Sequence, residues 1–158
     1  MLDCGEGTYG QMMRFFGEKQ CRHVLANLAG IFISHMHADH HIGLVGLLLA
    51  RQSALQQNSN PADTLLLIAP QQMNSWLHSY DFRYEPICSL FTIISSDKFS
   101  EPDYDSEFAH HVHEAFDLKL LVTTRVEHCK NAFGISVTTL DGFKLTYSGD
   151  DLIKLKLL

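Results

Sequence analysis

Three histidines and one aspartate follow directly on a short apolar run, and this arrangement constrains the fold of the chain more than any other feature. The apolar run is Ile31-Phe32-Ile33, and His35, His37, Asp39 and His40 come after it with the spacing H-x-H-x-D-H. A short apolar run of this kind is typical of a strand that is buried on both faces. The polar side chains therefore lie at the carboxyl edge of a strand, where α/β sheets usually bind ligands.

The side chains of this segment are of the types that bind transition metals. Neutral imidazoles and carboxylates are good ligands for zinc and acceptable ligands for manganese or iron. A single histidine beside a strand is usually structural or exposed, but this cluster predicts a metal site. Asp39 and His40 can point to different sides of the turn, so the segment can serve two metal ions. The next residue, His41, is expected to support the site or to lie at the surface.

A closed metal site needs ligands from other parts of the chain, and two positions fit. His128 follows a predicted strand at residues 118–126, and Asp150 follows the second strand of a hairpin that turns at Asp141-Gly142. Either residue taken alone more often has a structural role, such as a turn for an aspartate that follows glycine. We select both because the H-x-H-x-D-H segment lacks partners.

The rest of the pattern alternates between helices and strands, which indicates an α/β protein with a mixed sheet. Thr8 is expected to cap a first helix with Gln11 as its partner, and Gly30 to stop a second helical stretch. Residues 44–55 predict a further helix, and Pro70 opens the next one, whose aromatic residues are expected in the core. Strands are expected at residues 2–4, 31–33, 65–69, 118–126, 135–140 and 143–147.

Composition limits the classes of function. The 158 residues are 46% hydrophobic and 19% charged, which fits one globular domain and excludes a disordered chain or a coiled coil. The net charge of −6 argues against a strongly basic nucleic-acid binder. The sequence shows neither a membrane span nor a signal peptide. Four cysteines without a C-x-x-C pair indicate reduced thiols in an intracellular protein.

Several other features are expected to be structural. The acidic stretch at residues 97–117 is interpreted as a solvated loop or insertion. Its histidine cluster at 110, 111 and 113 could form a second metal cluster, but it is interpreted as part of a solvated loop or helix. Cys4 and Cys129 are expected to be buried apolar-like residues and not ligands or nucleophiles. Lys130 and Asn131 are equally consistent with a phosphate contact and with a plain surface position. The chain lacks a phosphate-binding P-loop, G-x-S-x-G and H-E-x-x-H, which disfavours nucleotide hydrolases, serine hydrolases and zincins.

Four segments of the chain carry a family resemblance. They are LDCGEGT at 2–8, SHMHADHHIG at 34–43, HCKNAFG at 128–134 and YSGD at 147–150. Together they resemble the metallo-β-lactamase superfamily and, more closely, the long eukaryotic form of ribonuclease Z, the tRNA 3′-processing endonuclease. The H-x-H-x-D-H box is typical of the superfamily, whereas the first and third segments are much more specific to ribonuclease Z. The resemblance implies a partial αββα sandwich, one partial domain over residues 1–158 with an atypical tail at 152–158.

The resemblance also implies a zinc-dependent reaction on pre-tRNA. The implied ligands of one zinc ion are His35, His37 and His128. The implied ligands of a second zinc ion are Asp39 and His40, and the resemblance implies that Asp150 bridges both ions. The implied reaction cleaves the phosphodiester after the tRNA body and leaves a 3′-hydroxyl on the tRNA. Two cations can neutralise the charge that develops on phosphate and make hydroxide available near neutral pH. Asp39 can also orient the attacking water or take its proton; no substrate-binding residue is assigned.

The chain departs from this family pattern at both ends. Strands, a basic loop and a tRNA-gripping arm would lie before Met1, and a histidine of the second metal site and a Glu–His pair would lie after residue 158. Asp151 stands where the family usually has threonine. We therefore expect a fragment, an alternative product or a faulty gene model. Its first site should bind zinc, its second should bind weakly or not at all, and its nuclease activity should be low or absent.

Two other functions remain open at this point. One is another hydrolase of the same superfamily, acting on thioesters or small phosphodiesters. The other is a non-catalytic zinc-binding fragment that serves as a partner for another subunit. The family resemblance implies the nucleus or the mitochondrion as the compartment, although the chain shows no targeting segment.

Overall fold

The computed structural model describes residues 1–57, 64–100, 112 and 116–150, which form two three-stranded sheets and a layer of helices. Most of the acidic stretch, its histidines at 110, 111 and 113, and the tail at 152–158 lie outside the described residues. None of the described helices is long and apolar enough to cross a lipid bilayer.

The first sheet is parallel and is built from three short strands in the order β1-β2-β3. Its strands are β1 (Gly30–Phe32), β2 (Leu65–Ala69) and β3 (Phe91–Ser95). The N-terminal residues extend its β1 edge, because Leu2 pairs with Phe32 in parallel and the Asp3 amide donates to the Phe32 carbonyl at 2.8 Å. Asp3 is thereby brought to the carboxyl end of β1.

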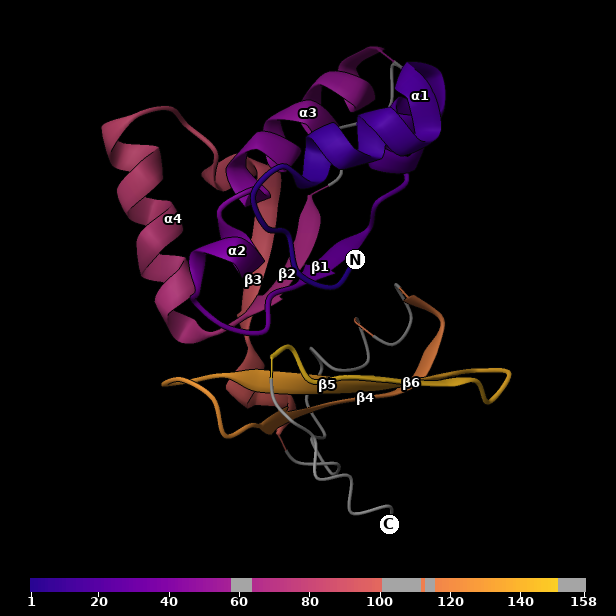
Figure 1. The fold of residues 1–158 in the computed structure, drawn as a ribbon, viewed down its shortest axis with the longest axis vertical. Helices are drawn as coiled ribbons and strands as arrows, with labels where there is room; N and C mark the ends of the chain where they lie inside the picture. The colour runs from indigo at the N-terminus through magenta and orange to yellow at the C-terminus, as the bar shows by residue number, and fades with distance from the viewer. Residues whose placement is uncertain (58–63, 101–111, 113–115, 151–158) are drawn as a thin grey trace.

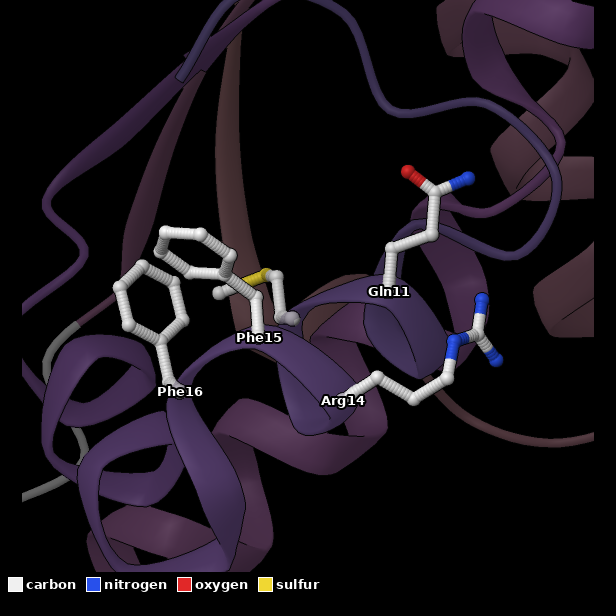
Figure 2. A pocket seen from close by; sticks show the side chains of 5 residues that line it. Gln11, Arg14, Phe15 and Phe16 are labelled. Carbon is white, nitrogen blue, oxygen red and sulfur yellow. The ribbon is translucent and has the colours of Figure 1, made fainter.

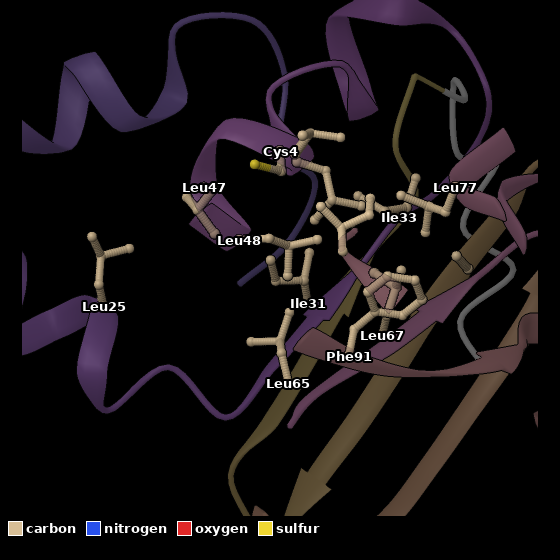
Figure 3. Close-up of a cluster of buried hydrophobic side chains, with 14 of the residues drawn as sticks. Cys4, Leu25, Ile31, Ile33, Leu47, Leu48, Leu65, Leu67, Leu77 and Phe91 are labelled. Carbon is tan, nitrogen blue, oxygen red and sulfur yellow. The ribbon is translucent and has the colours of Figure 1, made fainter. Parts of the chain in front are cut away.

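Helices cover one face of the parallel sheet (Figure 1). The helices are α1 (Thr8–Ala26), α2 (Ala38–His41), α3 (Leu44–Gln57) and α4 (Gln71–Arg83). Helix α1 bends at Gly17, whose φ is 73°. Alternate strand residues, including Ile31, Ile33 and Leu67, pack against α1, α3 and α4 in a continuous apolar cluster (Figure 3). Burying this face is what holds the helices on the sheet.

The second sheet is antiparallel and faces the other side of the first. Its strands, in the order β4-β5-β6, are β4 (Leu118–Arg125), β5 (Phe133–Thr139) and β6 (Lys144–Tyr147). Phe32, Ile68 and Ile94 of the parallel sheet pack against Leu121, Phe133 and Ile135 of this sheet in a second apolar cluster. The described part of the chain therefore has three layers, helices, parallel sheet and antiparallel sheet (Figure 1).

The predicted fold class is confirmed, with one refinement. Parallel and antiparallel pairing are both present, but they are divided between two sheets. The strand at 31–33 is buried on both faces as expected, because Ile31 and Ile33 face the helices while Phe32 faces the second sheet. The Asp141-Gly142 hairpin between β5 and β6 is also present.

Two local predictions were wrong, and one strand was missed. Thr8 does not cap α1, because Gly7 is the N-cap residue and the Thr8 hydroxyl instead donates to the Gly5 carbonyl at 2.8 Å. Gly30 does not stop a helix, because α1 ends at Ala26 and Gly30 begins β1. Strand β3 was not predicted; its short sequence, FTIIS, lies between two 3-10 turns, Cys88–Leu90 and Ser96–Phe99.

Candidate metal centre

The candidate metal centre lies where loops from both sheets meet. His35 and His37 lie in the loop after β1, and His40 lies in the short helix α2 that follows. His128 lies in the β4–β5 connection, and Asp150 lies just after β6. The Phe133 amide donates to the Ser34 carbonyl at 2.9 Å, so the antiparallel sheet is joined directly to the histidine loop.

Three imidazole nitrogens form the first group of donors. His37 Nδ1 lies 3.0 Å from His35 Nε2 and 3.1 Å from His128 Nε2. Ligand atoms on one tetrahedral zinc ion are roughly 3.3–3.8 Å apart, given zinc–ligand distances of about 2.0–2.3 Å. These two separations are therefore within a few tenths of an ångström of the spacing that zinc requires, and all three nitrogens lie within 4.8 Å of one another.

A second group of donors consists of His35, His40 and Asp150, and it shares His35 with the first. Asp150 Oδ1 lies 3.1 Å from His40 Nε2, while its Oδ2 lies 3.7 Å from His128 Nε2 and 3.9 Å from His35 Nε2. The two carboxylate oxygens thus face different imidazoles. Asp39 stands at the solvent-facing rim, with its side chain 78% exposed and its Oδ2 3.8 Å from His40 Nε2.

Asp3 is the structural hub beneath these ligands. Its carboxylate accepts hydrogen bonds from the Ser34 amide and hydroxyl at 2.7 Å, from His40 Nδ1 at 2.7 Å and from the Tyr147 hydroxyl at 2.6 Å. Burial, followed by the hydrogen bond and charge of Asp3, raises the pKa of Tyr147, so its hydroxyl remains a donor. One side chain thus connects the N-terminal segment, the histidine loop and β6.

These hydrogen bonds determine which imidazole nitrogens carry lone pairs. The Ser34 hydroxyl donates to Asp3, so it accepts from His35 Nδ1 at 2.9 Å and leaves His35 Nε2 unprotonated in the neutral ring. His40 Nδ1 donates to Asp3, so in the neutral ring Nε2 of His40 points a lone pair at Asp150 Oδ1. Two acceptors that face each other at 3.1 Å are stabilised by a cation or a proton between them. The donor set therefore fits a metal ion.

The pKa shifts follow from the same environment. Burial, and then the nearby rings of His40, His37 and His128, lowers the pKa of His35 to about 4, so this imidazole is neutral at physiological pH. Burial alone would lower the pKa of His40. The hydrogen bond and charge of Asp3, together with the charges of Asp150 and Asp39, outweigh the effect of burial, so the pKa of His40 is raised. The acidic groups around His40 thus favour positive charge at this position.

Glycines allow the loops to approach this closely. A Cβ atom on Gly43 would lie 2.0 Å from the Gly5 carbonyl oxygen, and the Gly43 amide donates to the Cys4 carbonyl at 3.0 Å. Gly149 has a φ of 68°, and a Cβ atom there would lie 2.9 Å from Ser34 Oγ. The turn before Asp150 can therefore pack directly on the histidine loop.

The structure brings together His35, His37, His40, His128 and Asp150, and it places Asp39 beside them at the rim. His41 is 6% exposed, with its ring 5.0 Å from that of Trp76, so it lies in the interior and not at the surface. Cys4 is fully buried as predicted, and burial raises the pKa of its thiol to about 11.

Sequence reasoning missed two contributors to the site. One is Asp3, whose place in the LDCGEGT segment gives no signal of the distant residues that it binds. Cys129 was expected to be buried and apolar-like, yet it is only partly buried, and its sulfur lies within 4.8 Å of donor atoms of His35, His37 and His128.

A separate open pocket of about 530 Å³ lies against α1 and shares no residue with this centre. Figure 2 shows its lining, Gln11, Met12, Arg14, Phe15 and Phe16. The rings of Phe15 and Phe16 meet edge to face at 4.9 Å, and the side chain of Phe15 is 83% exposed.

Comparison with known proteins finds close relatives over almost the whole chain. It is 38% identical over 157 residues to "Ribonuclease Z, mitochondrial" of Drosophila melanogaster and 37% identical over 158 residues to "Zinc phosphodiesterase ELAC protein 2" of Homo sapiens. Each match covers 96% of this chain but only 20% and 19% of the relative. The chain thus spans about a fifth of the length of these relatives. No protein-family model matches it.

Solved structures show the same fold. The structure of a long-form RNase Z from yeast superposes with a TM-score of 0.84 over 96% of this chain and 24% of that one, at 22% identity. A metallo-β-lactamase fold protein of Bacillus subtilis, YhfI, superposes with a TM-score of 0.61 over 94% of this chain and 50% of that one, at 14% identity. The described elements therefore adopt the metallo-β-lactamase fold.

Proposed function

We propose that this chain forms the metal-binding part of a ribonuclease Z, a zinc-dependent endoribonuclease that removes the 3′ trailer of pre-tRNA. The observation that carries this proposal is the convergence of His35, His37 and His128, with Asp150 Oδ2 within 4 Å of two of them, in a chain whose relatives are named ribonuclease Z and zinc phosphodiesterase. Because the chain covers only a fifth of those relatives, both the activity and the pre-tRNA substrate are part of the proposal.

We assign two unequal metal positions to the described residues. The first has His35, His37, His128 and Asp150 Oδ2 as its donors, which is a full tetrahedral set for zinc. The second has Asp39, His40 and Asp150 Oδ1, one donor fewer. We expect the first position to hold zinc more tightly than the second. When bound, the ions supply Lewis acidity at the phosphodiester and lower the pKa of water toward neutrality.

The protein groups around these positions then have distinct tasks. Asp150 holds both positions at a fixed separation because its two oxygens face different imidazoles. Asp3 keeps Nε2 of His40 directed at Asp150 by accepting from Nδ1, the arrangement in which a carboxylate orients a metal-binding histidine. Asp39 is the exposed carboxylate at the rim, so it is placed to orient the attacking water or to accept its proton.

A cleavage assay tests the proposal. Excess purified protein loaded with zinc is incubated with a pre-tRNA that carries a 3′ trailer, and the products are separated on a gel. We expect slow cleavage that leaves a 3′-hydroxyl on the tRNA, abolished in His37→Ala and unchanged in His23→Ala, an exposed histidine of α1. Asp39→Asn should lower the rate while leaving the first zinc in place.

Other outcomes of this assay separate the alternatives. Cleavage of a chromogenic phosphodiester without cleavage of pre-tRNA favours another hydrolase of the same fold. Zinc binding without either activity favours a non-catalytic zinc-binding fragment. Pre-tRNA cleavage that survives His37→Ala contradicts the assignment of the centre.

The compartment is proposed on the same basis. The Drosophila relative is named as mitochondrial, and we infer that this chain acts inside the cell, in the mitochondrion or the nucleus. Fractionation of cells that express the tagged protein from its own gene tests this inference.

A further inference from the structure

The residue after His128 offers a donor that the proposed function does not use. The Cys129 sulfur and donor atoms of His35, His37 and His128 all lie within 4.8 Å of one another. Cys129 is a free, partly buried thiol. Three imidazoles and one thiolate supply four donors, the number that a tetrahedral zinc ion takes, and both groups are common zinc ligands.

The β4–β5 connection holds this thiol toward the imidazoles. Its ends are joined by a hydrogen bond from the Val126 amide to the Ala132 carbonyl at 3.1 Å, and the Ala132 amide donates to the Cys129 carbonyl at 3.2 Å. Asn131, with a φ of 59°, takes the left-handed position of this turn. A turn of fixed geometry therefore presents His128 and Cys129 side by side.

We propose that the Cys129 thiolate is an alternative fourth ligand of the metal ion held by His35, His37 and His128. This inference rests on the proposed metal centre. Binding releases the thiol proton and forms a metal–sulfur bond in the position otherwise taken by Asp150 Oδ2 or by water. Asp150 Oδ1 remains facing His40. The resulting N₃S set leaves no open position for a substrate, and soft metal ions prefer it to the set with a carboxylate.

Cobalt substitution tests the inference with a readout that does not depend on activity. Cobalt(II) is added to the reduced, metal-free protein under anaerobic conditions, and the absorption spectrum is recorded. We expect visible d–d bands together with a near-ultraviolet thiolate-to-cobalt charge-transfer band. In Cys129→Ser and Cys129→Ala the charge-transfer band should disappear while the d–d bands remain. Circular dichroism confirms that both variants are folded.

Cys88 provides the matched control, because it is also a partly buried thiol beside an imidazole, with His78 Nδ1 at 3.3 Å from its sulfur. Cys88→Ser should keep the charge-transfer band. Visible bands without a charge-transfer band, or a band that survives in both Cys129 variants, would overturn the role of Cys129 but leave the metal centre intact. A wild-type protein without any cobalt bands would overturn the metal centre itself, and this inference with it.

Discussion

At the scale of single residues, the centre depends on a carboxylate that does not point into it. Asp3 accepts four hydrogen bonds from Ser34, His40 and Tyr147, and its side chain is only 9% exposed. A buried carboxylate is stabilised by such donors, and each donor would be left unsatisfied without it. Asp3 therefore contributes to stability and to ligand orientation at the same time.

Asp3→Asn should destabilise the protein by about 3 kcal/mol, because an amide presents N–H groups to donors that need an acceptor. Tyr147→Phe removes only one of the four hydrogen bonds and should cost about 1–2 kcal/mol. The midpoint of urea unfolding, measured by circular dichroism without added metal, checks both values. A loss below about 0.5 kcal/mol in Asp3→Asn, the size of an ordinary surface substitution, would contradict the hub role.

The position of each residue in the sequence explains which residues of the site could be predicted and which could not. The histidines at 35, 37 and 40 could be predicted because all three follow closely on one short buried strand. The contribution of Asp3 could not be predicted, because its hydrogen-bond partners are 31, 37 and 144 positions away in the chain. For Cys129, residue type favoured a buried apolar role, and only the folded turn brings its sulfur to the histidines.

At the scale of elements, the connection between α2 and α3 is positioned by close backbone contact. The N-terminal loop passes directly beside Gly43. The Cys4 amide donates to the His40 carbonyl, and the Gly43 amide donates to the Cys4 carbonyl. This contact leaves no room for a side chain at Gly43. The histidine loop is therefore fixed by backbone packing as well as by hydrogen bonds to Asp3.

A pair of glycine substitutions separates this contact from helix propensity. Gly43→Ala would bring a Cβ atom to 2.0 Å from a backbone oxygen, so the loop must shift, at a cost of about 1–3 kcal/mol. Gly46→Ala adds a methyl group in open space within α3 and should stabilise the protein by up to about 1 kcal/mol. Thermal unfolding of the two variants provides the measurement. Equal shifts in the same direction would contradict the steric argument.

The elements that were predicted well have strong local signals. Residues 65–69 form a continuous apolar run and become β2 with those bounds, and Asp141-Gly142 becomes the β5–β6 hairpin. Strand β3 has a weaker pattern, and its identity depends on pairing with β2 in the parallel sheet. Helix α1 is interrupted at Gly17, whose φ of 73° and ψ of 164° are not helical, so the element consists of two helical stretches joined by a kink.

At the scale of the whole molecule, the centre joins both sheets. His35, His37 and His40 come from the parallel sheet side, whereas His128 and Asp150 come from the antiparallel sheet. The fold class could be predicted from the alternation of strands and helices. The division into two sheets could not be predicted from this alternation. It is determined by the apolar contacts of Phe32, Ile68 and Ile94 with the second sheet, and these contacts connect distant parts of the chain.

A ligand bound by residues from both sheets should stabilise the whole fold. At a free zinc concentration one hundred times the Kd, binding contributes about 2.7 kcal/mol. For a chain of this size, this corresponds to a rise in Tm of about 5–11 °C. The rise should disappear in His37→Ala and persist in His23→Ala. A rise of the same size in His37→Ala would indicate that zinc stabilises the protein from another site.

The separation of the centre along the sequence has a consequence for its assembly on the ribosome. His128 is 91 positions after His37, so at about 5–20 residues per second it is synthesised about 5–18 seconds later. During this interval the nascent chain presents neighbouring imidazoles without the groups that complete the coordination sphere. The proposed metal centre can therefore be completed only after the β4–β5 connection has been synthesised and has folded onto the histidine loop.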